Sequence, residues 1–289
     1  EGHFKSDKCI SWQESEINRF EHFIEILNIK EGDYVLDAGC GFGGLVSYFR
    51  KKGINAYGIT ISKTQYRENI KKIGDYFYHG DYTIFNKELV NKFDFIIMPG
   101  SLEHTYGGNP QLISTYKNKY KNMSNLFNMM KKYFKYNSIK KKILTTTLHI
   151  NKKFMNTWQA WVLERIYGGS YPLINKYSVA DSLKNSGYKI LEKKDKTWHY
   201  YYPSYCNLSH FGNPYNIGET VLLFLPLYPH IIYAYIYTNL GGWMWQFDGK
   251  NHKRRNTEKC IPQKGCDLTF EKNINKRPVT LFYTIAQLT

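Results

Sequence analysis

Hydrophobic residues recur with two alternating periods along the first half of the chain. Apolar positions at helical spacing predict a helix over residues 14–29, and a polar turn then leads into a short apolar strand over Tyr34–Asp37. The same patterns predict strands over Ala56–Thr60, Tyr76–His79, Phe93–Met98 and Ile143–Leu148, and helices over Lys63–Ile73 and 112–134. Strands that alternate with helices indicate an α/β fold with a parallel sheet covered by helices on both faces.

The pattern loosens after residue 150. A helix is predicted over Tyr177–Ser186, a sixth strand over Lys189–Lys193 and a last strand over Val279–Ala286. About 80 residues rich in Tyr, Trp, His and Pro separate the last two strands, and an insertion of that length suggests a lid or a pocket wall. Within it, Val221–Leu240 is apolar, but its prolines favour a lid over a membrane span or a membrane-facing surface.

The most informative segment joins the first strand to the next helix and reads Asp37-Ala38-Gly39-Cys40-Gly41-Phe42-Gly43-Gly44. A phosphate-binding P-loop would need Lys and then Ser or Thr after the last glycine, but Leu45 follows. The dinucleotide fingerprint has a different glycine spacing. The carboxylate of Asp37 suits a ligand with a free amino group and no phosphate. We expect a ligand site at this turn, and the alternative is a tight turn whose glycines serve packing alone.

This Asp-x-Gly-x-Gly-x-Gly pattern resembles motif I of the S-adenosylmethionine (SAM)-dependent methyltransferases. Up to residue 110 the chain resembles more specifically the cyclopropane fatty acid synthase group, which includes the mycolic acid cyclopropane synthases. The other matching segments are Gly58-Ile59-Thr60-Ile61-Ser62-x-x-Gln65, Gly80-Asp81-Tyr82, Phe93-Asp94 and Ser101-x-Glu103-His104. The resemblance implies a class I, Rossmann-like methyltransferase sheet with SAM as its cofactor. We divide the chain into a SAM-binding core over 1–150 and a part over 151–289 that completes the core, with the lid insertion at about 195–275.

The resemblance also implies how the cofactor is held. The glycine backbone approaches the methionine part of SAM because no Cβ stands in the way, and Asp37 holds the amino group. Thr60 and Gln65 stand where many methyltransferases place an acidic residue for the ribose, and Asp81 with Tyr82 is expected at the adenine. An alternative gives Ser62 only a helix-capping role and Gln65 a surface position. The full expected cofactor set is Asp37, Gly39, Cys40, Gly41, Gly43, Thr60, Gln65, Asp81, Tyr82, Gly100 and Ser101.

Glu103 and His104 are the predicted catalytic residues because they follow the fourth strand, where the methyl acceptor is expected. In cyclopropane synthases a matching glutamate helps to hold a bicarbonate that acts as general base. The resemblance therefore gives Glu103 that role or the orientation of a polar group of the substrate, and the alternative is a helix-capping carboxylate. His104 is either a second polar contact or a packed core histidine.

The other bicarbonate partners of the group have no match in this chain. The group uses a His-Thr-Ile at the end of the fifth strand, where this chain has Thr145-Thr146-Thr147-Leu148 with His149 shifted along. It also uses a Tyr shortly before Gly265-Cys266, where this chain has Ile261-Pro262-Gln263-Lys264. Bicarbonate is therefore a doubtful cofactor, and simple methyl transfer is favoured over cyclopropane formation.

We expect a SAM-dependent methyltransferase that acts on a small hydrophobic or lipid-like acceptor. The first alternative is a cyclopropane-fatty-acyl-phospholipid synthase that acts on unsaturated acyl chains. The second is a non-catalytic SAM-binding or membrane-associated module. Aromatic residues of the insertion are expected to line the acceptor pocket, with core packing as the alternative role, and they are Trp198, His199, Tyr200, Trp243 and Trp245.

Charge and cysteine content add a prediction about surroundings. The net charge is +16, and no acidic residue occurs between Thr105 and Leu163, where lysines gather. The lysines over 117–153 are expected on the exposed face of an amphipathic helix. They reflect compositional bias, peripheral contact with an anionic membrane or, as the least favoured explanation, nucleic-acid binding without a recognised motif. The five scattered cysteines indicate a reducing cytoplasmic compartment and no metal site.

Overall fold

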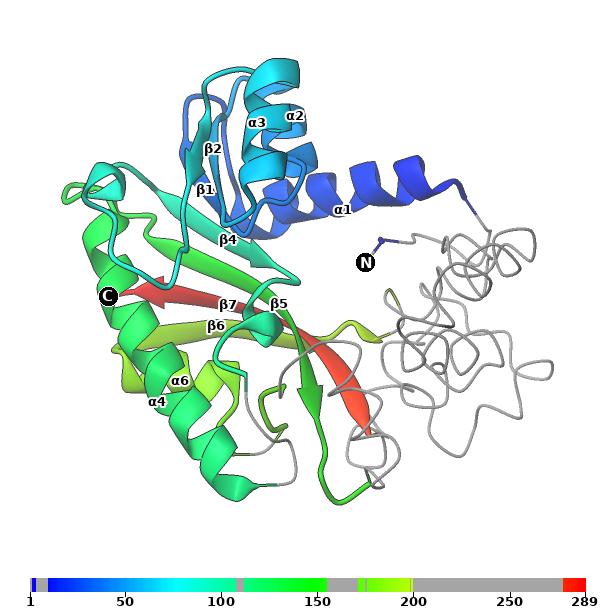
Figure 1. Cartoon of the computed structure of the whole chain (residues 1–289), viewed down its shortest axis with the longest axis vertical. Helices are drawn as coiled ribbons and strands as arrows, with labels where there is room; N and C mark the ends of the chain where they lie inside the picture. Colours follow the sequence, from blue (N-terminus) through cyan, green and yellow to red (C-terminus); the bar gives the residue numbers. More distant parts are fainter. Residues whose placement is uncertain are drawn as a thin grey trace.

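The fold is a seven-stranded sheet with strand order β3-β2-β1-β4-β5-β7-β6 (Figure 1). This computed structural model describes residues 2–3, 10–107, 112–154, 171–174, 176–197, 199 and 278–289. The strands are β1 (Tyr34–Ala38), β2 (Asn55–Thr60), β3 (Phe77–His79), β4 (Phe95–Pro99), β5 (Lys142–Ile150), β6 (Tyr188–Asp195) and β7 (Val279–Leu288). Each strand predicted from the sequence is present, with ends that differ by at most two residues.

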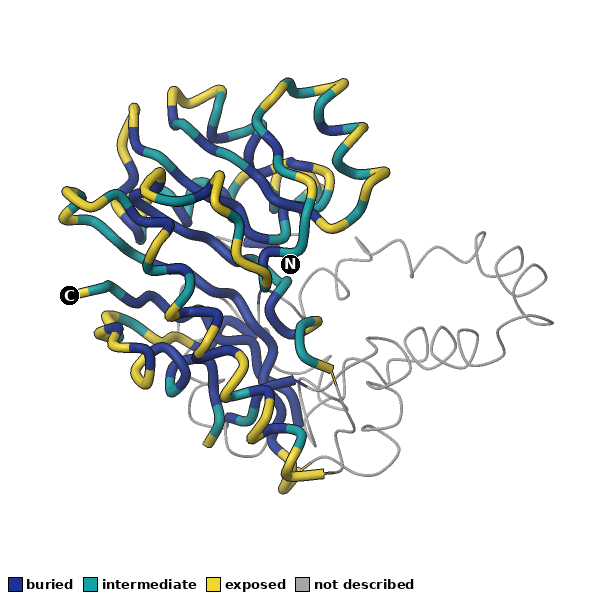
Figure 2. The backbone as a smooth tube through the Cα atoms, turned by 60° about the vertical axis from the view of Figure 1, so that its left-hand side comes forward, coloured by how far each residue is buried: buried dark blue, intermediate teal, exposed yellow. Residues whose placement is uncertain are grey.

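Helices pack on both faces of the sheet, as the alternating pattern predicts. The α-helices are α1 (Trp12–Leu27), α2 (Gly44–Lys51), α3 (Lys63–Lys72), α4 (Ile113–Met130) and α6 (Val179–Asn185), and short 3₁₀ helices are η1 (Lys87–Leu89), η2 (Leu102–His104) and η3 (Lys131–Tyr133). One core lies between the sheet and α1 to α3, and the other lies between the sheet and α4 with α6. The strands are accordingly buried along most of their length, whereas helix surfaces and turns are exposed (Figure 2).

The sheet is parallel over its first five strands, as expected, but its last strand runs the other way. β1 to β5 pair in parallel, but β7 runs antiparallel to both β5 and β6. Parallel neighbours need a crossover connection, which the helices between the first five strands supply. Antiparallel neighbours need none, so the alternation of helices and strands carries no information about the direction of β7.

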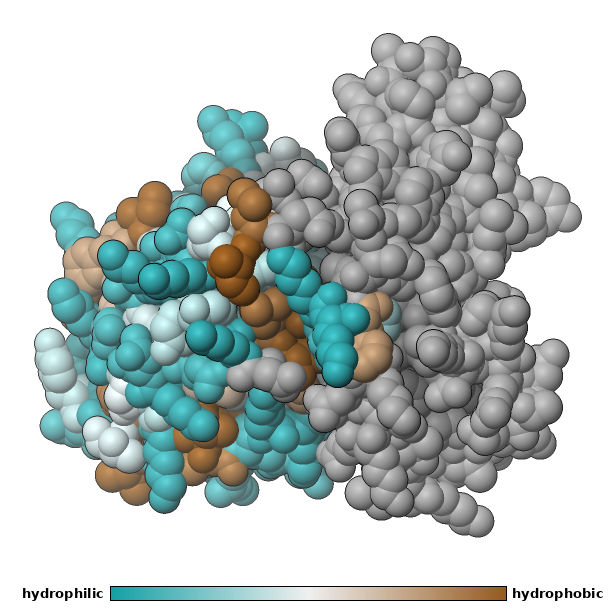
Figure 3. Space-filling view, turned by 90° about the horizontal axis from the view of Figure 1, so that it is seen from below, coloured by the Kyte–Doolittle hydropathy of each residue, from teal (hydrophilic) through white to brown (hydrophobic). Residues whose placement is uncertain are grey.

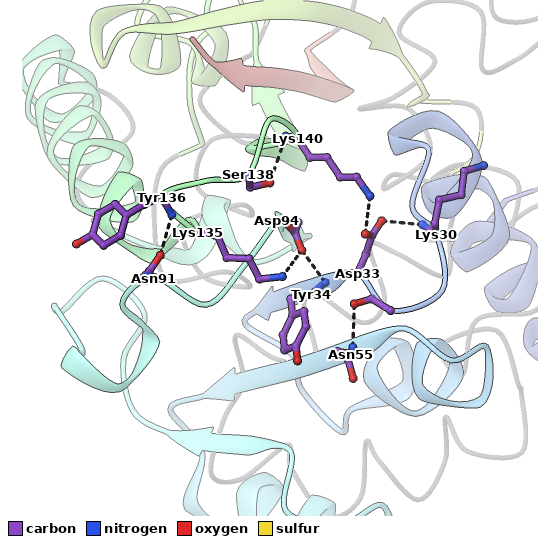
Figure 4. A network of polar contacts seen from close by, with 11 residues as sticks. Lys30, Asp33, Tyr34, Asn55, Asn91, Asp94, Lys135, Tyr136, Ser138 and Lys140 are labelled. Atoms are coloured by element: carbon purple, nitrogen blue, oxygen red, sulfur yellow. Dashed lines mark hydrogen bonds and ion pairs between the residues drawn. The ribbon is translucent and has the colours of Figure 1, made fainter.

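The edge of the sheet opposite the glycine turn is held by two ion pairs (Figure 4). Lys140 binds Asp33 with Nζ 2.5 Å from Oδ1, and Lys135 binds Asp94 with Nζ 2.7 Å from Oδ2. The other oxygen of Asp33 accepts a hydrogen bond from the Lys30 backbone N–H at 2.8 Å. Two lysines of the lysine-rich segment therefore tie the connection between β4 and β5 to the starts of β1 and β4.

The prediction of an exposed lysine face on 112–134 is partly wrong. Lys117 and Lys121 on α4 are exposed as expected, but Lys119 between them is 1% exposed. Among the described residues no helix is long and apolar enough to span a bilayer. The candidate segment Val221–Leu240 lies outside the described residues.

Candidate functional site

Three glycines of the turn between β1 and α2 adopt positive φ angles. The values are +94° at Gly39, +54° at Gly41 and +71° at Gly43, in a region that L-residues with a Cβ rarely occupy. The turn is held from two sides. The backbone N–H groups of Gly39 and Cys40 both donate to the Ile59 carbonyl at 3.0 Å, and Asn69 Nδ2 of α3 donates to the Gly41 carbonyl at 2.9 Å.

The glycines of this turn differ in what surrounds them. A Cβ at Gly39 would lie 2.5 Å from the Cβ of Ser101, so Gly39 lets the ends of β1 and β4 approach. Ser101 Oγ secures that approach by donating to the Ala38 carbonyl at 2.8 Å. A Cβ at Gly41 would have no heavy atom within 4 Å. Packing therefore explains Gly39, whereas Gly41 borders open space that a ligand could enter.

Asp37 is a buried carboxyl group at the carboxyl end of β1, 2% exposed. Its Oδ1 has no hydrogen-bond partner within the described part of the chain. Burial raises the pKa of Asp37 to about 7, against the opposing effect of the Arg19 guanidinium on α1. A buried acceptor of this kind favours a ligand that brings a cationic donor, since leaving it unpaired costs free energy. Cys40 beside it is buried too, and burial raises the pKa of its thiol.

The ends of β2 and β3 carry the residues expected at the ribose and adenine. Thr60 Oγ1 donates to Gln65 Oε1 at 2.8 Å, and Ser62 caps α3 by accepting from the Gln65 backbone N–H at 3.3 Å. The capping role of Ser62 is therefore confirmed, but Gln65 is half-buried and oriented by Thr60 rather than simply a surface residue. Asp81 is also half-buried, and its Oδ1 accepts from the Thr83 backbone N–H at 2.8 Å.

Tyr82 and Ile61 differ in exposure at this end of the sheet. Tyr82 is buried, and its ring lies 3.4 Å from the position of a Cβ on Gly39. Burial raises the pKa of its phenol, which therefore stays protonated at neutral pH. Ile61, directly after β2, is 72% exposed. An exposed isoleucine next to the expected ribose site is an apolar surface against which a ligand ring could pack.

Glu103 lies in η2, directly after β4, and is 3% exposed. The start of this segment is held to β5, because the Gly100 backbone N–H donates to Thr146 Oγ1 at 3.0 Å and to the Thr146 carbonyl at 2.9 Å. Lys119 Nζ of α4 donates to the Glu103 carbonyl at 2.8 Å. His104 is exposed, so the interpretation of it as a packed core histidine is wrong.

His149 and His199 are both buried, and each contacts identifiable partners in the fold. His149 Nδ1 lies 2.9 Å from the Thr147 carbonyl and its Nε2 accepts from the Val179 backbone N–H at 3.3 Å. Burial lowers the pKa of His149 to about 3, so the ring is neutral with its proton on Nδ1. His199 is 2% exposed and stacks on His3, with ring centroids 4.3 Å apart. The other aromatic residues predicted at the acceptor lie outside the described residues: Trp198, Tyr200, Trp243 and Trp245.

Three side chains at the site were not anticipated from the sequence. Arg19 acts on Asp37 from α1, Asn69 holds the glycine turn from α3, and Lys119 contacts Glu103 from α4. A signal for Lys119 exists in hindsight. It stands three residues after Tyr116 and four before Met123, both buried, and this spacing places it on the inner side of the helix.

The sheet order, its reversed β7 and the glycine turn after β1 together define the class I methyltransferase fold. The family model for mycolic acid cyclopropane synthetase matches residues 2–204, and the chain belongs to this family.

Solved structures of the family share this fold. The cyclopropane synthase MmaA2 from Mycobacterium tuberculosis is 16% identical, with a TM-score of 0.63 over 99% of this chain and 88% of that one. The mycolic acid cyclopropane synthase CmaA1, solved with SAH and CTAB, is also 16% identical, with a TM-score of 0.66 and the same coverage.

Curated relatives match over short segments only. A probable fatty acid methyltransferase from Mycobacterium tuberculosis is 34% identical over 65 residues, which are 22% of this chain and 15% of the relative. N-methyltransferase 4 from Papaver somniferum is 34% identical over 106 residues, which are 34% of this chain and 30% of the relative.

Proposed function

We propose that this chain is a SAM-dependent methyltransferase that transfers a methyl group to a small hydrophobic or lipid-like acceptor. The observation that carries the proposal is the buried Asp37 carboxyl group. Its Oδ1 has no hydrogen-bond partner within the described part of the chain, and the adjoining turn has open space at Gly41. The family membership and the names of the fatty acid methyltransferase relatives support both the chemistry and the acceptor class. The complex of CmaA1 with SAH supports the choice of cofactor.

The residues present fit SAM along the edge of the sheet. Asp37 would bind the amino group, the backbone around Gly41 would approach the methionine part, and the Gln65 amide turned by Thr60 would reach the ribose. Asp81 would bind the adenine amino group. Bound SAM supplies an electrophilic methyl group on a sulfonium. The protein therefore has to position the acceptor in line with that group and keep water out.

Glu103 is the acidic residue that we assign to the acceptor. It lies directly after β4, and the carboxyl ends of β1 and β4 meet because these strands pair in parallel. A buried carboxylate at this position would orient a polar group of the acceptor or accept its proton. The division into a core and a lid insertion at about 195–275 accompanies this assignment and, like the acceptor pocket, stays a prediction.

The donors around β5 favour methyl transfer over cyclopropane formation. Both ring nitrogens of His149 already bind backbone groups, at Thr147 and Val179. Its ring therefore offers no nitrogen to a bicarbonate ion. Of the residues that hold bicarbonate in the cyclopropane synthases, the described part of this chain has a buried match to the glutamate, which is Glu103. We therefore give bicarbonate no role in the proposed reaction. Cyclopropane synthesis on unsaturated acyl chains remains the alternative function because the matching family carries that name.

Replacing Glu103 with Gln should leave SAM binding within about threefold of wild type and lower turnover by about 10²-fold or more, because the carboxylate acts on the acceptor only. Calorimetry measures the first quantity. Transfer of a labelled methyl group from SAM to a panel of oleate, dioleoyl phosphatidylglycerol vesicles and tyramine measures the second.

The same assay separates the rival functions. Wild-type protein that binds no SAM would overturn the proposal, and so would SAM binding without transfer to any member of the panel. Mass spectrometry of a lipid product distinguishes a retained double bond, expected for methyl transfer, from a lost one, expected for cyclopropane formation. Full turnover by Glu103→Gln at saturating acceptor would remove Glu103 from its role.

We further propose peripheral contact with an anionic membrane. Among the lysines over 117–153, Lys135 and Lys140 form ion pairs within the fold. The exposed lysines of this segment are Lys117, Lys121, Lys132, Lys152 and Lys153. Leu112 and Ile113 are more than half exposed at the start of α4, one turn before Lys117. Seen from below, hydrophilic residues cover most of the described surface, with a band of hydrophobic residues among them (Figure 3). Basic and apolar groups together favour an interfacial surface.

Changing the five exposed lysines to Gln should weaken binding to phosphatidylglycerol vesicles at least tenfold, since each lysine near such a surface contributes roughly 1 kcal/mol. Co-sedimentation at low and high salt measures it. The matched control changes five exposed lysines elsewhere in the chain, which are Lys30, Lys51, Lys71, Lys72 and Lys92. If both variants bound the vesicles equally weakly, net charge alone would explain the effect, and the proposal would be contradicted.

A further inference from the structure

Lys119 is a lysine placed almost entirely out of solvent, 1% exposed, on the inner side of α4. A buried ammonium group is costly unless charge and hydrogen bonds compensate it. Its Nζ donates to the Glu103 carbonyl at 2.8 Å. The Glu103 side chain, 3% exposed, acts on it electrostatically as an opposite charge. The ammonium group is thus held next to the residue that we assign to the acceptor.

Other lysines of the same segment show that this placement is specific. Lys117 and Lys121, two positions away on either side, are exposed. Lys131, at the far end of the helix, lies over the ring of Tyr188 with Nζ 5.9 Å from the ring centroid. Within the described part of α4, Lys119 is the lysine whose ammonium group contacts η2.

We propose that Lys119 is a positioning residue for Glu103, which it holds through the main-chain carbonyl while its charge keeps the neighbouring carboxyl group ionised. This inference rests on the proposed function. The hydrogen bond restrains η2 between β4 and α4, and the opposite charge offsets the cost of a carboxylate away from water. In this role Lys119 acts on the acceptor through Glu103.

The groups around Lys119 give the pair a defined pH response. Burial lowers the pKa of Lys119 to about 7, and the Glu103 charge opposes that shift. Lys119 acts electrostatically on His149 of β5, whose ring is neutral because burial lowers its pKa to about 3. Lys193 of β6 also acts on His149, and burial lowers its pKa as well. Among the described residues, Glu103 is the charged group that stabilises the charged form of Lys119, and that form is lost as pH rises through about 7.

The test compares Lys119→Met and Lys119→Arg with Lys131→Met as the matched control. Lys119→Met should lower kcat at pH 6.5 by about 10- to 100-fold, with SAM affinity and binding stoichiometry unchanged. Lys119→Arg should recover part of kcat and remove the fall in activity above neutral pH, because an arginine stays charged. Lys131→Met should match wild type. The stoichiometry of SAM binding reports the folded fraction, so a variant that merely misfolds is recognised.

A double-mutant cycle with Glu103→Gln tests that Lys119 works through Glu103. In the Glu103→Gln background, Lys119→Met should change kcat by less than about threefold. A second measurement needs no acceptor, because the ¹³Cε resonance of Lys119 reports its titration. That pKa should fall in Glu103→Gln, since the stabilising charge is gone.

The results that overturn the inference differ from those that overturn the proposed function. Wild-type turnover and pH profile in Lys119→Met, an additive double mutant, or a Lys119 titration indifferent to Glu103→Gln would each contradict the positioning role. Absence of methyl transfer by the wild-type protein would instead contradict the proposed function, and the ¹³C titration would still decide whether the two residues are coupled.

Discussion

Replacing Asp37 with Asn should abolish SAM binding and yet make the ligand-free protein more stable above neutral pH. Burial raises the pKa of Asp37 from 3.8 to about 7 in the folded state. The carboxyl group therefore favours folding at low pH, and that contribution is lost as pH rises from 3.8 through about 7. The free energy of unfolding that is lost in this way amounts to at most roughly 4 kcal/mol at pH 8. Asn carries no charge, so it avoids this loss while it also lacks the anion that binds an ammonium group.

Three measurements check this prediction. Urea unfolding at pH 4 and pH 8 should give a gain for Asp37→Asn at the higher pH only. Calorimetry should show loss of SAM affinity by more than about 10²-fold. For wild-type protein, SAM affinity should fall as pH drops below about 7, because binding then requires Asp37 to release a proton.

Asp33, at the other end of the same strand, is the matched control. It forms an ion pair with Lys140, so Asp33→Asn should lower stability at pH 8 and leave SAM binding intact. The assignment of Asp37 to the cofactor would be contradicted if Asp37→Asn bound SAM within about threefold of wild type.

Gly41→Ala and Gly39→Ala should separate ligand binding from folding at the glycine turn. A Cβ at Gly41 meets no atom within 4 Å, and its φ of +54° lies in the left-handed region, which costs an alanine about 1 kcal/mol. Gly41→Ala should therefore fold with little loss of stability and bind SAM at least tenfold more weakly, because the methyl group stands in the expected cofactor space.

Gly39→Ala should instead fail in folding as well as in binding. Its Cβ would stand 2.5 Å from Ser101 Cβ, and its φ of +94° is strained for alanine. The loss should be several kcal/mol, because either the backbone or the β1–β4 contact has to shift. Thermal unfolding and SAM titration of both variants check the pair. Normal SAM binding by Gly41→Ala would show that the ligand does not approach this glycine.

Much of the site could be predicted from the sequence because its information is local. The strand ending at Asp37, the glycines and the helix that follows are consecutive, so their order alone implies a turn with an acidic residue at its start. Ser62 caps α3 through the Gln65 backbone three residues later, which is a local pattern too. Glu103 follows β4 directly, so the strand prediction also placed Glu103 at the carboxyl edge of the sheet.

The features that sequence analysis missed depend on residues far apart in the chain. Burial keeps His149 neutral, and its Nε2 accepts a hydrogen bond from the Val179 backbone N–H at the start of α6, thirty residues later. The direction of β7 follows from pairing with β5 and β6, across a segment of the chain that shows no alternating pattern. His104, interpreted either as a contact or as a core residue, lies in η2 and is exposed.

The amino-acid order by itself determined the elements, the glycine turn and the edge of the sheet at which Asp37 and Glu103 lie, because each depends on neighbours within a few residues. Only the assembled fold determined which charged groups lose their water. Asp37 meets Arg19 of α1, and Lys119 meets Glu103 across η2 and α4. Burial and long-range charge set their protonation, and neither quantity exists until the helices pack against the sheet.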